Sequence, residues 1–178
     1  MKYFKKMIGD KVYLSPVNSD DYLKYVEWLN NYNIAKGVNQ IRKILTIETE
    51  KEFLSKKTDD CYNFAIINKS NDMLLGNISL MKVDFVDRTA ELGIFIGEED
   101  NLGKGYGSDA IRLILEYGFN QLNLNNIMLR VYSFNELAIN AYKKCGFKIF
   151  GTLKEAHYFE GKYCDEIYMN ILKRNFKK

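Results

Sequence analysis

A glycine-rich segment from Leu102 to Ser108 (LGKGYGS) combines residue types and spacing that point directly to chemistry. Its three alternating glycines allow the backbone to turn tightly and to approach a ligand closely. A helical pattern follows, and the first turn of a helix presents unpaired N–H groups at the positive end of its dipole. This combination suits a phosphate or pyrophosphate. A purely structural turn between a strand and a helix has the same composition, so the segment alone does not distinguish a phosphate-binding loop from such a turn.

Two familiar phosphate-binding loops do not fit this segment. A Walker A loop needs GxxxxGK followed by Ser or Thr, and the run from Gly103 to Ser108 lacks that spacing. A Rossmann fingerprint needs GxGxxG early in a βαβ unit, whereas the GxGxG of this chain follows three strands typical of an antiparallel meander. The spacing therefore disfavours both a nucleoside triphosphatase and a dinucleotide-dependent enzyme.

The other residues with chemical potential are sparse. His157 is the only histidine, and no Ser–His–Asp or Cys–His pattern accompanies it, so covalent catalysis is not indicated. Cys61, Cys145 and Cys164 lack CxxC spacing, which favours neither a metal site nor a disulfide framework. Unpaired cysteines are typical of a reducing compartment, and we expect a cytoplasmic protein without a metal.

Composition indicates a single folded domain over residues 1–178. Hydrophobic residues make up 47% of the 178 positions, which excludes a disordered or fibrous chain. The net charge of +3, from 26 basic and 23 acidic residues, argues against a nucleic-acid-binding protein. No apolar run approaches the roughly 18 residues of a membrane span, and the N-terminus lacks the apolar stretch of a signal peptide. We therefore expect no membrane partner.

Hydrophobic periodicity predicts a mixed α/β (α+β) chain, with a mostly antiparallel sheet of about seven strands flanked by about four helices. Strands are expected at 11–17, 62–69, 73–83, 89–97, 126–132, 147–159 and 163–172. Helices are expected from Ser19 to Leu29, Ile47 to Lys57, Gly107 to Asn123 and Asn135 to Cys145, with Thr46 and Asn135 as N-caps and 30–40 as a loop.

Two motifs on these elements make the chain resemble the GNAT N-acetyltransferases. The segment from Leu102 to Gly107 is similar to the family's [QR]-x-x-G-x-[GA] signature, which binds the pyrophosphate of acetyl-CoA. Asn135 to Phe147 (NELAINAYKKCGF) resembles its second signature, an Asn, a small residue three positions on, then Tyr and Gly-Phe. The order of elements also resembles the family fold, and the last stretch, His157 to Met169, is similar to the RimJ/RimL-like and spermidine acetyltransferase-like branch.

The resemblance implies that acetyl-CoA is the cosubstrate. The first position of the loop motif is Leu102, where Arg or Gln is usual, so only its backbone amide is expected to contribute. The family's backbone contacts to the thioester and pantetheine fall on the end of the strand before the loop. The implied acetyl-CoA-binding residues are Phe95, Ile96, Gly97, Leu102, Gly103, Lys104, Gly105, Tyr106, Gly107, Ser108, Asn135, Ala138 and Lys144.

Tyr142 and Glu91 are the catalytic residues that the resemblance implies. Tyr142 matches the tyrosine proposed to protonate the departing thiolate. A phenol has a reference pKa near ~10, above the ~8.5 of a typical thiol, so it is protonated at neutral pH and serves as a proton source without being ionised first. Glu91 lies on the strand where a family carboxylate accepts the proton of the amine, directly or through water. An ion-paired strand residue without a catalytic role remains an equal interpretation of Glu91.

The acceptor site implied by the resemblance lies between the first two helices and the terminal hairpin. Its residues are Trp28, Tyr32, His157 and Tyr158, with Trp28 also expected in the core. A polyamine, an amino sugar and a protein N-terminus all remain open as acceptors, and a homodimer is an expectation by resemblance alone. The predicted function is acetyl transfer from acetyl-CoA to a primary amine by direct attack in a ternary complex. The alternative is a non-catalytic acyl-CoA-binding or regulatory module on the same fold.

Overall fold

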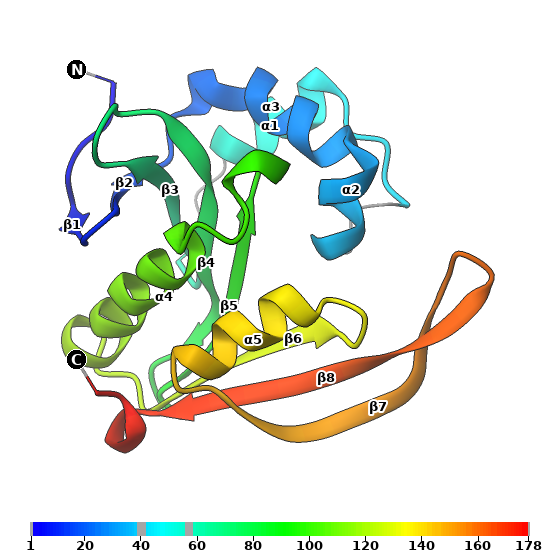
Figure 1. Ribbon diagram of the computed structural model, residues 1–178. Coiled ribbons are helices and arrows are strands. Elements are labelled where there is room, and N and C mark those ends of the chain that lie inside the picture. Colours follow the sequence, from blue (N-terminus) through cyan, green and yellow to red (C-terminus); the bar gives the residue numbers. More distant parts are fainter. Residues whose placement is uncertain (1, 39–41, 56–58, 178) are drawn as a thin grey trace.

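The computed structural model describes residues 2–38, 42–55 and 59–177, which form one eight-stranded sheet and its covering helices (Figure 1). The order of strands in the sheet is β1-β2-β3-β4-β5-β6-β8-β7. The strands are β1 (Met7–Ile8), β2 (Val12–Pro16), β3 (Tyr62–Asn68), β4 (Leu74–Asp84), β5 (Thr89–Ile96), β6 (Asn126–Tyr132), β7 (Lys148–Phe159) and β8 (Lys162–Leu172). The helices are α1 (Tyr22–Asn30), α2 (Tyr32–Ala35), α3 (Ile47–Ser55), α4 (Tyr106–Glu116) and α5 (Glu136–Lys144).

The mixed, mostly antiparallel sheet predicted from the sequence is confirmed, with one strand more than expected. The additional strand, β1, has two residues and pairs with β2 through Met7 and Leu14. Two residues show no alternation of apolar and polar side chains, so periodicity gave no signal for β1. Among the strand pairs of the described residues, only β5 and β6 are parallel.

The parallel pair β5–β6 is joined over only part of its length. Its three paired positions run from Thr89 with Asn126 to Glu91 with Met128. Beyond that point β5 stays with β4 as far as Ile96, while β6 follows β8. The two strands diverge as β5 rises towards the helices and β6 runs along β8 (Figure 1). One edge of the second half of β5 is therefore unpaired with β6.

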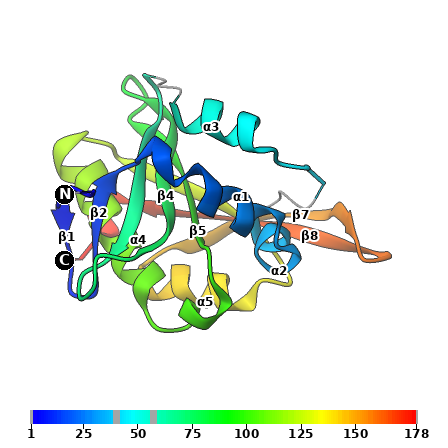
Figure 2. The ribbon, with the colours of Figure 1, turned by 90° about the horizontal axis from the view of Figure 1, so that it is seen from above.

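Helices α4 and α5 cover one face of the sheet, and α1 and α3 lie on the other (Figure 2). The larger core lies under α4 and α5. The sequence periodicity of α4 brings Ala110, Ile111, Ile114 and Leu115 to one buried stripe, with none of the four more than 1% exposed. Each such side chain contributes roughly 1.5–3 kcal/mol when fully buried, so this stripe fixes α4 against the strands that carry the site.

The polar segment 30–40 was expected to be a loop, and that expectation is wrong for most of it. It contains α2 and a 3-10 turn over Lys36–Val38. The side chain of Asn31 accepts a hydrogen bond from the Asn33 N–H and so caps α2, while Ile34 is buried. A helix as short as α2 depends on its tertiary contacts rather than on its own helix propensity. Gln40 lies outside the described residues.

The helix expected over 107–123 divides into two parts. Helix α4 ends at Glu116, and a π-helical turn follows over Tyr117–Gln121. Gly118 lies in this turn, where a Cβ atom would come within 2.9 Å of the Ile127 side chain. The close approach of the turn to β6 accounts for a glycine at this position.

Helix α3 confirms the predicted cap at Thr46, whose hydroxyl oxygen accepts from the Thr49 N–H at 3.2 Å. The helix ends at Ser55, and the predicted end at Lys57 lies outside the described residues. The first predicted helix starts three residues late, because Ser19–Asp21 forms a 3-10 turn capped by Asn18. Within the described residues, no helix combines the length and the apolar character that crossing a membrane requires.

Candidate active site

The glycine-rich segment forms the loop at the N-terminus of α4, as predicted. Gly103 and Gly105 have left-handed φ angles of +72° and +86°, and Gly105 is the N-cap residue of α4. A glycine N-cap has no side chain, so the N–H groups of Tyr106 and Gly107 in the first turn remain without a side-chain partner. This free helix terminus fits a pyrophosphate group.

Two details of the loop differ from expectation or extend it. The Leu102 N–H donates to the Glu99 carbonyl at 2.9 Å, so it is not free to bind the phosphate as predicted. The Lys11 Nζ donates to the Lys104 carbonyl at 2.7 Å and brings a second cation to the loop. A hollow of about 780 Å³ beside the loop is lined by Asp10, Lys11, Asn68, Lys69, Ser70, Gly103, Lys104 and Tyr106. Three of these residues are lysines, which favours an anionic group.

Asp109 anchors the same helix terminus and was not found from the sequence. Its Oδ2 accepts from the backbone N–H groups of Lys11 and Val12, at 2.8 and 3.0 Å. Asp109 is buried, and a Cβ atom at Gly9 would lie 2.5 Å from its Oδ2. An acid in the first turn of a helix usually compensates the dipole, so its sequence position gave no hint of this contact. The carboxylate fixes the glycine-rich loop relative to β2.

The end of β5 was predicted to supply backbone donors through Phe95, Ile96 and Gly97. The Gly97 N–H donates to the Leu75 carbonyl on β4 at 2.9 Å, which removes it from that set. Successive N–H groups of a strand point to alternate edges, so the Phe95 N–H also faces β4. The Ile96 N–H points to the opposite edge, which β6 leaves open. Of these three residues, Ile96 is therefore the one whose backbone N–H is directed into the gap between β5 and β6.

Trp28 lies beneath this end of β5 and is part of the core, as the sequence also suggested. It is 2% exposed, and a Cβ atom at Gly97 would lie 2.0 Å from its ring. Its ring meets the Phe95 ring edge-on, with centroids 6.2 Å apart. The Trp28 Nε1 is buried without a hydrogen-bond partner in the described structure. An unsatisfied buried donor beside Gly97 is consistent with a ligand atom at this position.

Tyr142 lies on α5 and faces the larger core. It is 8% exposed, and its ring meets the Phe147 ring with centroids 5.9 Å apart. Within the described residues its hydroxyl has no hydrogen-bond partner. Burial raises the pKa of Tyr142 well above its usual value, so the phenol keeps its proton. A protonated, unengaged hydroxyl is suited to donate a proton rather than to accept one.

The predicted N-cap of α5 is confirmed, because the Asn135 Oδ1 accepts from the Ala138 N–H at 3.2 Å. The Cys145 Sγ lies 3.6 Å from the Ser108 carbonyl oxygen, which ties the end of α5 to the start of α4. Lys144 is exposed at the end of α5. The two helices that carry the two motifs therefore lie side by side on one face of the sheet (Figure 1).

Glu91 is buried and ion-paired on two sides. Its Oε2 lies 2.8 Å from the Lys82 Nζ and its Oε1 lies 2.7 Å from the Arg130 Nε. Burial alone would raise the pKa of Glu91, but the hydrogen bonds from Lys82 and Arg130 outweigh it and hold that pKa below its usual value. An ionised carboxylate with both oxygens engaged is a weak direct base, which favours the ion-pair interpretation or a relay through water.

A row of polar side chains continues from Glu91 across the sheet. The Arg130 Nη1 lies 3.9 Å from the Glu166 Oε1, and the same oxygen lies 3.2 Å from the His157 Nε2. Glu166 is buried and also accepts from the Tyr168 hydroxyl at 2.8 Å. Lys82, Arg130 and Glu166 were missed in the sequence because strand register, which a single sequence does not reveal, brings them together.

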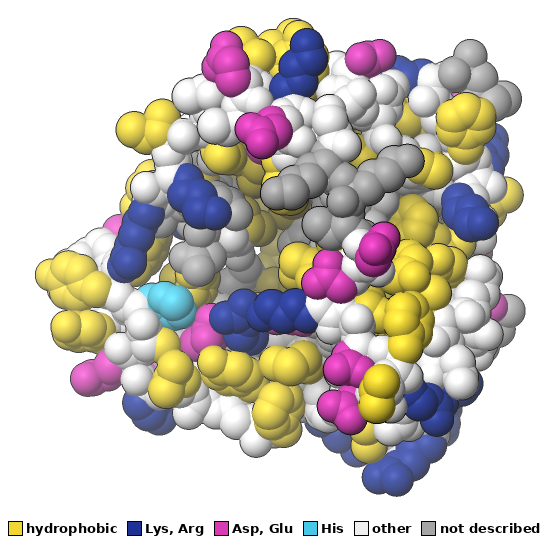
Figure 3. Space-filling view, turned by 180° about the vertical axis from the view of Figure 1, so that it is seen from behind, with side chains coloured by type: hydrophobic (Ala, Val, Ile, Leu, Met, Phe, Trp, Pro, Cys, Tyr) yellow, Lys and Arg dark blue, Asp and Glu magenta, His cyan; other side chains and the backbone are white. Residues whose placement is uncertain are grey.

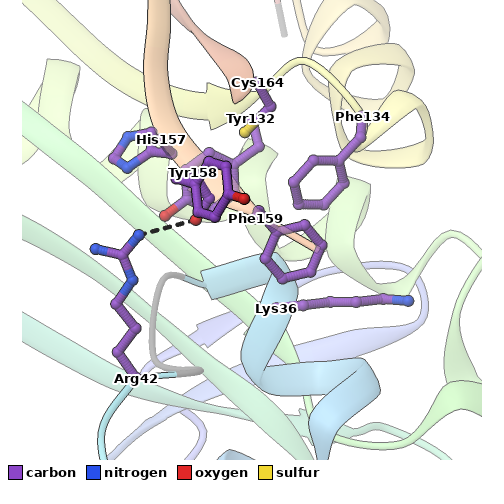
Figure 4. Close-up of a pocket in the computed structure, with 8 residues that line it drawn as sticks. All are labelled: Lys36, Arg42, Tyr132, Phe134, His157, Tyr158, Phe159 and Cys164. Carbon is purple, nitrogen blue, oxygen red and sulfur yellow. Dashed lines mark hydrogen bonds between the residues drawn. The ribbon is translucent and has the colours of Figure 1, made fainter. Parts of the chain in front are cut away.

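The β7–β8 hairpin closes a small pocket, whose lining is shown in Figure 4. The lining residues are Lys36, Arg42, Tyr132, Phe134, His157, Tyr158, Phe159 and Cys164. The Arg42 Nη2 donates to the Tyr158 carbonyl at 2.9 Å, and the rings of Tyr132 and His157 meet edge-on at 4.7 Å. Figure 3 shows this face hollowed, with basic and acidic side chains at the margin.

The four residues predicted to bind the acceptor fall into two groups. His157 and Tyr158 line the hairpin pocket, and Tyr32 lies beside it. The Tyr32 ring stacks on Phe159 at 6.4 Å, and its hydroxyl donates to the Glu160 carboxylate. Trp28 belongs to the core under β5 instead.

The open edge of β5, the free helix terminus of α4 and the buried phenol of Tyr142 on α5 are thus carried by one mixed sheet and its helices. Residues 11–148 match the model of the acetyltransferase (GNAT) domain. The chain belongs to this family, and the protein is an acetyltransferase.

Its relatives include spermidine acetyltransferases. The chain is 37% identical to spermidine N(1)-acetyltransferase of Escherichia coli K12 over 166 residues, 93% of this chain and 88% of that protein. It is 31% identical to the enzyme of the same name from Vibrio cholerae over 129 residues, 72% of this chain and 74% of that protein. The crystal structure of the Vibrio cholerae enzyme in complex with CoA and spermine has a TM-score of 0.83 at 27% identity, covering 93% and 97% of the two chains.

Proposed function

We propose that the protein transfers the acetyl group of acetyl-CoA to a primary amine of a small molecule, by direct attack of the amine in a ternary complex. The observation that carries this proposal is the open edge of β5, where the Ile96 N–H points into the gap beside α5. Spermidine acetyltransferase relatives support an amine as the acceptor, and the CoA complex of one of them supports the cosubstrate. The reaction is carried by one domain over residues 1–178.

In this reaction some residues of the chain bind the cosubstrate and others transfer protons. The first turn of α4 and the lysines beside it receive the pyrophosphate, and acetyl-CoA supplies the thioester for the transfer. The Ile96 N–H stabilises negative charge that develops on the carbonyl oxygen. Tyr142, which its raised pKa keeps protonated, gives its proton to the thiolate sulfur as the C–S bond breaks. Glu91 receives the amine proton through water, since Lys82 and Arg130 engage its own oxygens.

Thiol release from acetyl-CoA in the presence of single amines tests this function. The amines are spermidine, an amino sugar and a peptide with a free N-terminus, and mass spectrometry locates the added acetyl group. Amine-dependent thiol release with the acetyl group on nitrogen is the expected result. Acetyl-CoA binding without amine-dependent release, for every amine, would contradict the proposal and favour the non-catalytic alternative.

A further inference from the structure

The hairpin pocket is positively charged. Among the described residues that line it, Lys36 and Arg42 carry a permanent charge, and none is an Asp or a Glu. In the described part of the chain, neither cation lies within ion-pair distance of a carboxylate. Arg42 donates to a neutral carbonyl, and the Lys36 Nζ lies 5.9 Å from the centroid of the Tyr32 ring. Arg42 therefore remains available to an anionic ligand, whereas Figure 4 shows the Lys36 ammonium pointing away from Arg42.

Two carboxylates lie near the pocket, but in the described residues neither forms an ion pair with Lys36 or Arg42. Glu166 already accepts from the Tyr168 hydroxyl and lies within 3.2 Å of the His157 Nε2. Glu160 accepts from the Tyr32 hydroxyl at the tip of the hairpin. The sequence from residue 30 to residue 46 contains three cations, Lys36, Arg42 and Lys43, and no acid. A ligand with several ammonium groups meets like charge here, whereas an anionic group meets opposite charge.

The pocket is small and admits only the tip of a ligand. Its enclosed volume is about 20 Å³, and one water molecule needs roughly 10–15 Å³ of such space. Figure 4 shows the Arg42 guanidinium and the His157 ring on the same side of Tyr158. An arginine presents a planar fork that matches the oxygens of a carboxylate or a phosphate. His157, Glu166 and Arg130 then form a continuous polar row from the pocket to Glu91, where β5 and β6 part.

We infer that the acceptor amine carries an anionic group, a carboxylate or a phosphate, which the hairpin pocket receives through Arg42. This inference rests on the proposed acetyl transfer and narrows its acceptor. The relatives are named for spermidine, which is a cationic amine, so the inference gives this chain a different class of acceptor. The body of the acceptor extends along the polar row and brings its amine to the gap between β5 and β6.

Matched amines test the inference. The first pair is 4-aminobutyrate and its neutral amide, the second is glucosamine 6-phosphate and glucosamine, and spermidine is the cationic comparison. We expect kcat/KM for at least one anionic amine to exceed that of its neutral partner and that of spermidine by about tenfold or more, since a hydrogen bond to a charged group has that magnitude. The pair that shows the preference identifies the anion as a carboxylate or a phosphate.

Variants connect the preference to the pocket. Arg42→Gln should lower the ratio of anionic to neutral kcat/KM about tenfold, and Arg42→Lys should retain part of it. Lys43→Gln is the matched control, because it removes a neighbouring cation that does not line the pocket, and its ratio should equal that of the wild type. A higher kcat/KM for spermidine than for both anionic amines, or an unchanged ratio in Arg42→Gln, would overturn the inference.

Calorimetry separates this inference from the proposed function. If no amine releases thiol although acetyl-CoA binds, the proposed function fails. Titration of 4-aminobutyrate and glucosamine 6-phosphate into the CoA-bound protein then decides the inference alone. Binding that Arg42→Gln weakens tenfold supports the anion pocket, and absence of binding to the wild type overturns it.

Discussion

Glu91 and Arg130 form an ion pair of 2.7 Å between β5 and β6 at the point where the two strands part. Glu91 belongs to the last paired position of β5, and Arg130 lies two residues beyond the last paired position of β6. The Lys82 Nζ reaches the same carboxylate from a bulge in β4, where Lys82 has a left-handed φ of +51°. Three strands are thus joined by charge at the apex of the gap in which we propose that acetyl transfer takes place.

Glu91→Gln should destabilise the protein at neutral pH. The wild-type carboxylate has a lowered pKa, so its contribution is present above the usual value near 4.5 and is lost as the pH falls through the folded-state pKa. We expect a loss of about 1–2 kcal/mol in the free energy of unfolding at pH 7, because Lys82 and Arg130 still reach solvent. Urea denaturation at pH 7 and near pH 3 measures the difference, which should shrink at the lower pH.

Glu27→Gln serves as the control for this charge change, because Glu27 forms an exposed pair with Lys24. Its effect on unfolding should stay within about 0.5 kcal/mol at both pH values. Equal stability of wild type and Glu91→Gln at pH 7 would contradict the structural role assigned to the ion pair.

Gly97→Ala should damage both the fold and the cofactor end of β5. The added Cβ would lie 2.0 Å from the Trp28 ring, which is buried and has little room to move. Overpacking of this kind costs roughly 1–3 kcal/mol. Thermal unfolding and acetyl-CoA titration should both show weakening. Gly151→Ala is the control, because its Cβ would lie 3.9 Å from its nearest neighbour, which is an ordinary contact. Unchanged acetyl-CoA affinity in Gly97→Ala would contradict a site at this strand end.

Asp109→Ala should loosen the glycine-rich loop. The substitution leaves the buried Val12 N–H without its acceptor, which costs about 1–3 kcal/mol of unfolding free energy. Affinity for CoA should fall as well, because the same carboxylate fixes the first turn of α4. Asp100→Ala, at an exposed acid near the loop, is the control. A variant that loses stability but binds CoA as the wild type does would show that Asp109 supports the fold alone.

The sequence predicted the elements that local pattern determines. The long strands are rich in apolar residues and are bounded by turn signals, and the caps at Thr46 and Asn135 follow from residue type and position, so all of these are confirmed. The glycine-rich loop was placed correctly because Gly103 and Gly105 adopt conformations that other residues rarely accept. The family resemblance assigned Tyr142 and the acetyl-CoA-binding positions, whose roles remain predictions.

Contacts between distant segments could not be predicted from one sequence. Asp109 meets Lys11 across 98 positions, and Glu91 meets Arg130 across 39, because register and helix placement bring them together. The Leu102 and Gly97 N–H groups donate hydrogen bonds to backbone carbonyls. These bonds depend on local backbone geometry, which residue type does not specify. Helix α2 was missed because its polar sequence shows too little periodicity.

The comparison of Tyr142→Phe with Tyr117→Phe tests the proposed chemistry most directly. Burial raises the pKa of both tyrosines. Tyr117 packs against Phe64 and Tyr62 and belongs to neither motif, so it serves as the control. The measurement is kcat for amine acetylation together with the dissociation constant of acetyl-CoA. We expect Tyr142→Phe to lower kcat about 10²-fold or more with nearly unchanged affinity, and Tyr117→Phe to alter neither. A Tyr142→Phe variant with the wild-type kcat would remove Tyr142 from the mechanism.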